Sequence, residues 1–185
     1  MDNKFIPKSL DNTSSRLKNS LRSLDMTEEK FWLMKSEPDA YSIDTLKNDG
    51  VTLWDGIRNY QARNFMRKMN KGDKVFFYHS NCKPPGIVGL MEVIDLNIVD
   101  PTQFDKDSKY FDPKSKTDNP RWDCVKVKFL SKSDQILSLP ELKILFNEDE
   151  LLVVKKGNRL SILPVKNDIA KLPVSYTHLR AHETR

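Results

Sequence analysis

The stretch Trp54–Ser80, WDGIRNYQARNFMRKMNKGDKVFFYHS, contains the pattern from which the rest of the fold can be worked out. It predicts a strand that ends at Trp54, a short helix, and an aromatic-rich strand over 74–80. The helix is indicated by apolar residues at i, i+3, i+4 and i+7, which are Ala62, Phe65, Met66 and Met69. Lys71-Gly72-Asp73 ends it. We therefore expect two strand ends on either side of a short helix.

Polar and aromatic residues gather at the ends of these predicted elements. Gly56 permits a tight turn between Asp55 and Arg58. We expect the turn to bring seven side chains within reach of one another: Trp54, Asp55, Arg58, Asn59, Tyr78, His79 and Ser80. An aromatic plate beside a few polar groups suits a planar heterocycle. The sequence therefore predicts a site for a flat ring here, with Trp54 as the first candidate for the plate.

Each of the three tryptophans has an alternative role in packing. For Trp54 a core position is as consistent with the pattern as stacking on a ligand. Trp32 lies in the apolar run 31–34, which favours the core. Trp122 lies in an irregular segment, where closing the pocket as a lid and packing against the domain are equally open. Trp54 and Trp122 are therefore the candidates for a binding role.

The rest of the pattern predicts strands alternating with short helices. Strands are expected at 31–34, 51–54, 87–99, 125–130 and 159–165, and helices at 42–48 and 138–146. Residues 100–123 are irregular but contain four aromatic side chains, so we expect an ordered excursion across the domain. Strands dominate, and the helices are too short for a doubly wound sheet. These elements indicate an α+β fold, a curved or closed mixed sheet such as a β-barrel, with short helices packed outside.

The length of 185 residues suits one domain with a real core. We expect this domain at 31–172, after a mostly disordered arm at 1–30 in which polar residues dominate. Residues 173–185 continue no earlier pattern, and we interpret them as a non-native tail. His178 and His182 in the tail have zinc-ligand spacing, but no third ligand accompanies them, so we expect no metal site.

The charge of the chain limits its possible partners. The net charge is +5, but residues 31–170 contain 22 basic and 20 acidic residues, a net of only +2. Bulk attraction to polyanions is therefore not expected, and affinity for nucleic acid would need a local patch and a pocket. No apolar run of 18 residues is present, so we expect no membrane partner. We expect an intracellular monomer without a cofactor, with Cys82 and Cys124 reduced.

Seven short motifs occur in a characteristic order: Trp32–Pro38 (WLMKSEP), Trp54–Phe65 (WDGIRNYQARNF), Phe77–Asn81 (FYHSN), Pro85–Gly89 (PGIVG), Tyr110–Pro113 (YFDP), Pro120–Trp122 (PRW) and Arg159–Ser161 (RLS). In this order they resemble EVE domains, including those of the thymocyte nuclear protein family, over roughly residues 31–166. The resemblance implies a PUA-like fold. Because the similar YTH domains hold a methylated adenine in an aromatic cage, it also implies a reader of modified bases. Modified cytosine in DNA is the leading candidate, and the family implies no catalysis and, in a eukaryote, a nuclear protein.

Further polar residues at strand ends complete the expected base pocket. With the residues of the turn it consists of Lys35, Ser36, Glu37, Trp54, Asp55, Arg58, Asn59, Tyr78, His79, Ser80, Trp122, Arg159 and Ser161. Caps and turn bonds are their alternative roles: Asn59 can cap the helix that follows, and Asp55 can bond Arg58.

A basic stripe with a spacing of four residues lies on the predicted helix, formed by Arg63, Arg67 and Lys71. These side chains suit contacts to phosphates, which position a nucleic acid without reading its sequence. A solvated helix face is the alternative interpretation.

Two other functions stay open. One is a small hydrolase that acts on a modified nucleoside or amide, with Lys35, Glu37 and Tyr78 as acid, base and electrophile. That function needs a nucleophile or activated water, and the sequence has no Ser/His/Asp or metal pattern to supply one. The other is a reader of methylated adenine in RNA, because a contact to the 2′-hydroxyl leaves no signature in the sequence.

Overall fold

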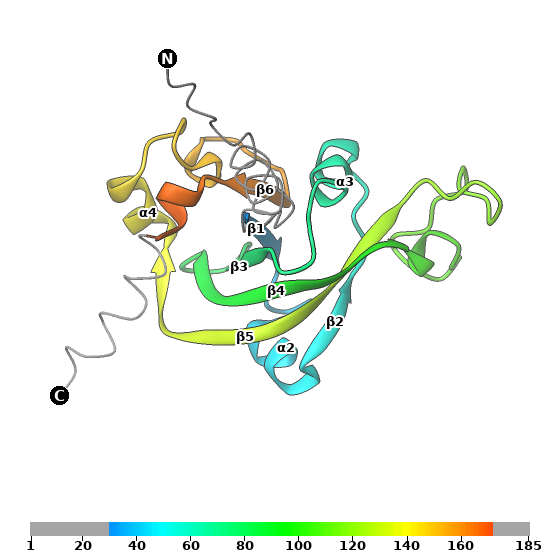
Figure 1. Cartoon of the computed structure of the whole chain (residues 1–185), viewed down its shortest axis with the longest axis horizontal. Helices are drawn as coiled ribbons and strands as arrows, with labels where there is room; N and C mark the ends of the chain where they lie inside the picture. Colours follow the sequence, from blue (N-terminus) through cyan, green and yellow to red (C-terminus); the bar gives the residue numbers. More distant parts are fainter. Residues whose placement is uncertain (1–29, 172–185) are drawn as a thin grey trace, which may run out of the picture.

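The computed structural model describes residues 30–171, which are arranged around one mixed β-sheet (Figure 1). The predicted arm and tail lie outside the described residues, apart from Lys30 at the end of the arm. The described elements are β1 (Phe31–Ser36), α2 (Ile43–Asp49), β2 (Val51–Trp54), α3 (Tyr60–Met66), β3 (Lys74–His79), β4 (Gly86–Val99), η1 (Pro101–Gln103), β5 (Asp123–Ser138), α4 (Leu139–Leu145), η2 (Leu152–Val154) and β6 (Ile162–Val165).

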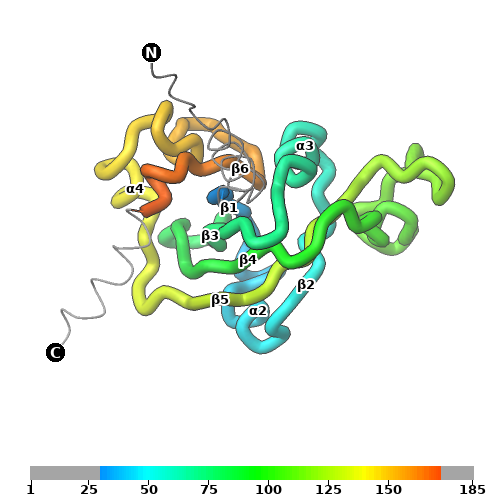
Figure 2. Tube along the Cα trace, in the orientation of Figure 1, coloured from blue at the N-terminus to red at the C-terminus, as the bar shows by residue number. Residues whose placement is uncertain are grey.

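The sheet has the strand order β2-β5-β4-β3-β1-β6, with β1 and β3 parallel and the other neighbours antiparallel. Strands β4 and β5 form a long ribbon whose register shifts at several bulges. Bulges bend a strand and increase its twist, and the ribbon curves accordingly (Figure 2). The α+β fold, with its curved mixed sheet and short helices, is therefore confirmed. A closed barrel is not formed, because β2 and β6 remain unpaired edges.

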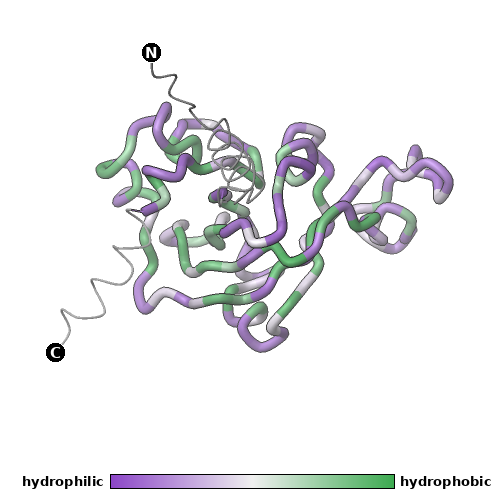
Figure 3. Tube along the Cα trace, in the orientation of Figure 1, coloured by the Kyte–Doolittle hydropathy of each residue, from purple (hydrophilic) through white to green (hydrophobic). Residues whose placement is uncertain are grey.

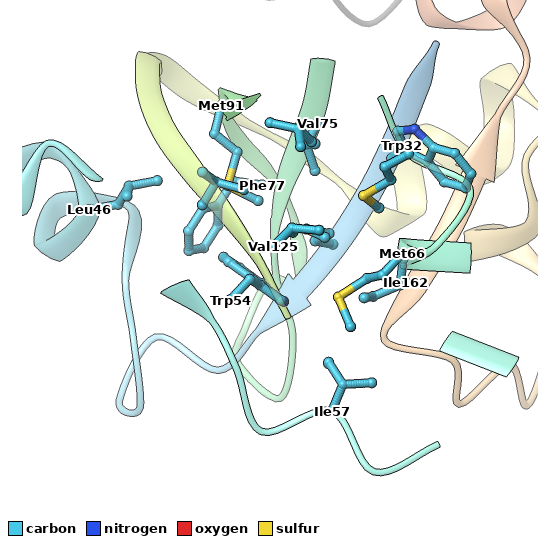
Figure 4. Packing of buried hydrophobic residues seen from close by; sticks show 14 of the residues in the cluster. Trp32, Leu46, Trp54, Ile57, Met66, Val75, Phe77, Met91, Val125 and Ile162 are labelled. Atoms are coloured by element: carbon cyan, nitrogen blue, oxygen red, sulfur yellow. The ribbon is translucent and has the colours of Figure 1, made fainter. Parts of the chain in front are cut away.

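Alternating side chains divide the core between the two faces of the sheet. On β1, Trp32 and Met34 join a first cluster of buried residues, whereas Leu33 joins a second. On β3, Phe77 belongs to the first cluster and Tyr78 to the second. The first cluster is packed under α2 and α3, and Figure 4 shows part of it. The second lies under α4 and η2. Successive residues of each strand thus point to different environments.

The helices begin where the sequence predicts them. Ser42, Asn59 and Ser138 are N-caps whose side chains accept backbone N–H groups, and Ser138 forms a capping box with Glu141. One boundary differs from expectation. Helix α3 ends at Met66, so Lys71 lies in the turn before β3. The carboxylate of buried Asp73 holds this turn, because it accepts the N–H of Asn70 and the indole N–H of Trp32.

Residues 100–122, here called the β4–β5 connection, are ordered as the sequence predicts, but the expectation that they lie across the domain was wrong (Figure 1). They project from one end of the ribbon, and Figure 3 shows hydrophilic residues at their tip. Two strand predictions were inexact. Strand β5 continues to Ser138, because its polar second half pairs with β4. Strand β6 begins at Ile162, so Arg159 and Ser161 precede it.

Candidate nucleic-acid interface

Ten of the thirteen expected base-pocket residues divide into three groups in the structure. The strand-end group is Ser36, Trp54 and His79, on the face of the first cluster. The lysine pocket includes Lys35, Tyr78 and Ser80, near the Gly86 end of the β4–β5 ribbon. The anchor group is Asp55, Arg58, Asn59 and Trp122, near the base of the β4–β5 connection. The expectation of one cluster was wrong, because neighbouring residues of a strand point to opposite faces.

The strand-end group is connected by a row of aromatic rings. Ser36 and His79 end β1 and β3 and lie opposite each other in the parallel register. The ring of His79 lies edge-to-face on Phe77, with 5.5 Å between centroids, and Phe77 lies edge-to-face on Trp54 at 5.3 Å. The curvature of the sheet thus brings the end of β2 to the end of β3, although the two strands are not neighbours (Figure 4).

Trp54 does not form an open plate. Only 7% of its surface is exposed, and Phe77 packs against it in the core (Figure 4). The packing interpretation of Trp54 therefore holds in the structure. A ligand at the strand ends could reach at most the small exposed part of this side chain.

His79 is held in its neutral form at the start of α2. The backbone N–H of Ile43 donates to Nε2 of His79 at 3.1 Å. Burial lowers the pKa of His79, Asp44 nearby opposes this shift, and Lys132 adds to it. Because an imidazolium has no lone pair to accept the Ile43 N–H, protonation breaks this contact.

This contact predicts a pH dependence of stability. The pKa of His79 is lower in the folded than in the unfolded protein, so its contribution is complete above the unfolded value of about 6.5. It is lost as the pH falls through the folded value. Between pH 7.5 and 5, we expect the wild type to lose more unfolding free energy than His79→Gln. Urea unfolding of both proteins across this range measures the difference, and parallel curves would contradict the prediction.

The lysine pocket is a cavity with a volume of about 300 Å³. Its floor includes Tyr78, which is 3% exposed, and Nζ of Lys35 lies 5.9 Å from the centroid of that ring. Burial lowers the pKa of Lys35 and raises the pKa of Tyr78 to about 12. The hydroxyl of Tyr78 is therefore a neutral donor throughout the physiological pH range.

The anchor group fastens the β4–β5 connection to the turn after β2. The carboxylate of Asp100 is fully buried and accepts the N–H of Gly56 at 2.9 Å and Nη1 of Arg58 at 2.7 Å. Arg58 also donates from Nη2 to Thr102 Oγ1 and from Nε to the carbonyl of Tyr110. Arg58 is thus occupied by internal bonds to the connection.

The other members of the anchor group have structural contacts as well. Asn59 caps α3 by accepting the N–H of Ala62, as its alternative interpretation predicts. Trp122 is 5% exposed and donates its indole N–H to Asp112, so it packs and does not form a lid. Burial and the negative charge of Asp100 raise the pKa of Asp55, and Arg58 opposes this shift. Bonding between Asp55 and Arg58, the alternative for that pair, is replaced by Arg58–Asp100.

Gly56 is required at this turn for two reasons. Its φ is +74°, in the region that favours glycine, and a Cβ there would lie 2.6 Å from the ring of Tyr110. The ring therefore packs directly on the backbone of the turn, as the expected tight turn allows. In the motif Trp54-Asp55-Gly56, the backbone conformation therefore requires the glycine, in addition to any role of the side chains.

Tyr60 and Arg121 are surface residues that the sequence reasoning missed. The ring of Tyr60 is 47% exposed and stacks on Trp122 with 4.9 Å between centroids. The guanidinium of Arg63 lies 4.7 Å from the Tyr60 centroid, and Arg121 donates to the Tyr60 hydroxyl. The motif Pro120–Trp122 was a signal for this contact, but its partner is about 60 residues away in the sequence.

The remaining candidates are at the surface or bonded through the backbone. Glu37 is exposed in the turn after β1, and Arg159 is exposed before β6. The carbonyl of Ser161 accepts the backbone N–H of Lys35.

The three expected phosphate ligands all have partners within the protein. Arg63 donates to the carbonyl of Arg121, Arg67 pairs with Asp123, and Lys71 pairs with Asp95 at 2.7 Å. Since the pairs of Arg67 and Lys71 are partly exposed, each is weak and exchangeable.

The chain matches the EVE domain family over residues 30–174. This chain belongs to the EVE domain family. The match spans the whole sheet and both ends of the β4–β5 ribbon.

Curated relatives of this EVE domain include thymocyte nuclear protein 1 from several vertebrates. The human protein is 41% identical over 173 residues, which cover 84% of this chain and 75% of the relative. The zebrafish (Danio rerio) protein is 50% identical over 123 residues, covering 60% of this chain and 53% of the relative. The chain therefore spans only about half the length of the zebrafish relative.

Solved structures with the same fold come from distant organisms. A hypothetical protein from Leishmania major superposes with a TM-score of 0.78 at 42% identity, covering 84% of this chain and 99% of that one. Human THYN1 in complex with DNA containing 5-methylcytosine has a TM-score of 0.75 at 40% identity, covering 80% and 98%. The YTH domain of Mmi1, solved with RNA, has a TM-score of 0.50 at 9% identity and shares the fold alone.

The described part of this EVE domain has neither a group of side chains suited to a metal ion nor a helix suited to span a membrane. Within residues 30–171 no three His, Cys, Asp or Glu side chains are grouped so as to hold a metal ion. No helix in that range is long and apolar enough to cross a membrane. The His178 and His182 pair lies outside the described residues.

Proposed function

We propose that this EVE domain binds DNA that contains a modified cytosine, without changing it chemically. The observation that carries the proposal is the match along 80% of the chain to human THYN1, which was solved with 5-methylcytosine DNA. An identity of 40% over that length is far above the 9% of the YTH neighbour, which supports DNA over RNA as the partner.

The strand-end group is the proposed site of the base. Flipping a base out of a duplex costs a few kcal/mol, and stacking on an aromatic side chain returns about 1–3 kcal/mol per base. These energies are similar, so hydrogen bonds must decide which base is accepted. Ser36 and His79 are polar groups at the ends of two neighbouring strands, and Glu37 follows directly. We place the base at this mouth, with the exposed edge of Trp54 beside it.

Surface arginines and lysines supply the proposed contacts to the DNA backbone. Arg67 and Lys71 are 42% and 63% exposed in their ion pairs. A phosphate can replace a carboxylate partner at small cost, since exposed pairs contribute only about 0–1 kcal/mol. Arg63 lies beside the exposed ring of Tyr60, and we include it among the phosphate contacts.

We also infer that the protein acts as a nuclear reader in a eukaryotic cell. Its relatives are named thymocyte nuclear protein 1, which supports this location. A non-catalytic role is supported by the complex of a relative, human THYN1, with DNA containing 5-methylcytosine.

Binding of labelled oligonucleotides to the full chain tests the proposal. Fluorescence anisotropy should give tighter binding to a strand containing 5-methylcytosine than to the same strand with cytosine. The same sequences as RNA provide the comparison of nucleic-acid type, and mass spectrometry of the recovered strands detects any turnover. Equal affinity for modified and unmodified DNA would refute the reader, and release of a modified product would favour the hydrolase.

A further inference from the structure

The lysine pocket is formed by elements that are far apart in the sequence. Its wall contains the ends of β1 and β3, Pro85 before β4, Leu139 and Lys143 of α4, and residues 153–158 in and after η2. These elements lie at the Gly86 end of the β4–β5 ribbon, opposite to the β4–β5 connection (Figure 1). The pocket is thus separate from Arg63, Arg67 and the anchor group.

The charge of the pocket has one sign. Lys35, Lys143, Lys155 and Lys156 line it, and no Asp or Glu does. Among the described residues, Lys143, Lys155 and Lys156 form no ion pair, in contrast to Lys71, Lys74 and Lys132 elsewhere. Within residues 30–171, Nζ of Lys35 donates to the carbonyl of Asn158 at 3.4 Å and lies over the Tyr78 ring, and it forms no ion pair. Four ammonium groups around one cavity favour an anion in its centre.

The other lining groups suit a phosphate with an organic part attached. Tyr78, Ser80 and two asparagines, Asn81 and Asn158, carry hydroxyl and amide donors. The Tyr78 hydroxyl stays protonated because burial raises its pKa to about 12. Apolar surface from Val153, Val154 and Leu139 completes the wall. Donors and cations beside an apolar wall match a phosphate on a sugar.

We propose that the lysine pocket binds a phosphate group of the DNA strand next to the flipped base. This proposal rests on the proposed function. Its geometric basis is the sequence Lys35-Ser36 at the end of β1, where one residue faces the pocket and the next belongs to the strand-end group. The two side chains point to opposite faces of the sheet, but they are the last two residues of β1, so a strand that passes over the end of β1 can place a base beside Ser36 and its phosphate beside Lys35. Free phosphate has the same chemistry, and the experiment separates the two sources.

The test compares two triple variants with equal charge. Lys143→Gln, Lys155→Gln and Lys156→Gln remove exposed lysines of the pocket, whereas Lys47→Gln, Lys106→Gln and Lys114→Gln remove exposed lysines elsewhere. We expect the pocket variant to bind a 5-methylcytosine strand about five- to eightfold more weakly at 0.1 M salt, the effect of one lost phosphate contact. The slope of log K against log salt should fall by about 0.7–0.9. The control triple should change neither quantity.

Two readouts separate this proposal from the proposed function. The ratio of affinities for methylated and unmodified strands should stay the same in the pocket variant, because the base site is unchanged. If the wild type bound methylated and unmodified strands equally, base reading would be refuted. A reduced salt slope in the pocket variant would still support phosphate binding in the pocket. Urea unfolding of both triples checks that the fold is intact, which we expect because all six lysines are exposed.

Inorganic phosphate is the second probe, followed by the amide resonances of Ser80 and Asn81 in NMR spectra. If inorganic phosphate shifts these resonances while the pocket variant keeps the DNA salt slope of the wild type, the pocket binds free phosphate. The placement of the DNA strand is then overturned. If the slope falls as expected, the DNA backbone is the source. An unaltered slope without any phosphate shift overturns the proposal completely.

Discussion

Replacing Arg58 by alanine is expected to lower the free energy of unfolding by about 3–5 kcal/mol, the usual effect of removing one partner of a buried ion pair. Asp100 is fully buried and would lose its only cationic partner among the described residues. The carbonyl of Tyr110 and the hydroxyl of Thr102 would also lose their donors. Urea unfolding followed by tryptophan fluorescence measures the change.

Two further variants serve as controls for Arg58→Ala. Arg58→Lys keeps the charge, but a single ammonium nitrogen cannot reach Asp100, Thr102 and the Tyr110 carbonyl at once as the guanidinium does, so an intermediate loss is expected. Arg159→Ala removes an exposed arginine and should change stability by no more than about 0.5 kcal/mol. A loss for Arg58→Ala as small as that for Arg159→Ala would show that the connection is held mainly by the packing of Tyr110 and Trp122.

Replacing Trp54 by phenylalanine is expected to weaken binding of a 5-methylcytosine strand by roughly fivefold, the lower limit of the 1–3 kcal/mol of one base–aromatic contact, because only the exposed edge of the indole can meet a base. We expect the smaller ring to keep its packing on Phe77 and to lose the exposed edge of the indole. Anisotropy with the labelled strand measures the affinity, and urea unfolding of the same samples measures the accompanying loss of packing.

Trp32 provides the matched control, since it is a second tryptophan in the same cluster. It is 4% exposed and donates its indole N–H to Asp73 at 2.8 Å, so Trp32→Phe loses both packing and a buried hydrogen bond. We expect it to reduce stability at least as much as Trp54→Phe while leaving affinity unchanged. Equal affinities for the two variants would assign Trp54 to the core alone and remove it from the base site.

Local patterns were enough to predict most of the fold. The caps Ser42, Asn59 and Ser138 begin their helices, and alternating or continuous apolar residues lie on the strands. These features depend on residues close together in the sequence, for which spacing is informative. The open edges of the sheet and the length of β5 depend on pairing between distant segments. No local pattern in residues 131–138 indicates that β4 will accept them as a partner.

The site was harder to predict, for the same reason. Lys35 and Ser36 are neighbours in a motif, yet the alternation of β1 sends them to different faces of the sheet. Arg58 is a polar residue in a glycine-containing turn, but its partner Asp100 is 42 residues away. Sequence could identify which residues are chemically suitable. Assigning each of these residues to the base site, the lysine pocket or the anchor group required the register of the sheet.

Strand β1 lies between β3 and β6, so the first strand of the domain pairs with the last, and Phe31 is opposite Val165. A nascent chain leaving the ribosome can therefore form the β4–β5 ribbon early. Strand β1 can pair with β6, its second neighbour, only after almost the entire domain has been synthesised. Closure of so long a loop slows folding more than it weakens the folded state. A chain truncated before residue 162 would leave the hydrogen-bonding edge of β1 open to other chains, which is a route to aggregation.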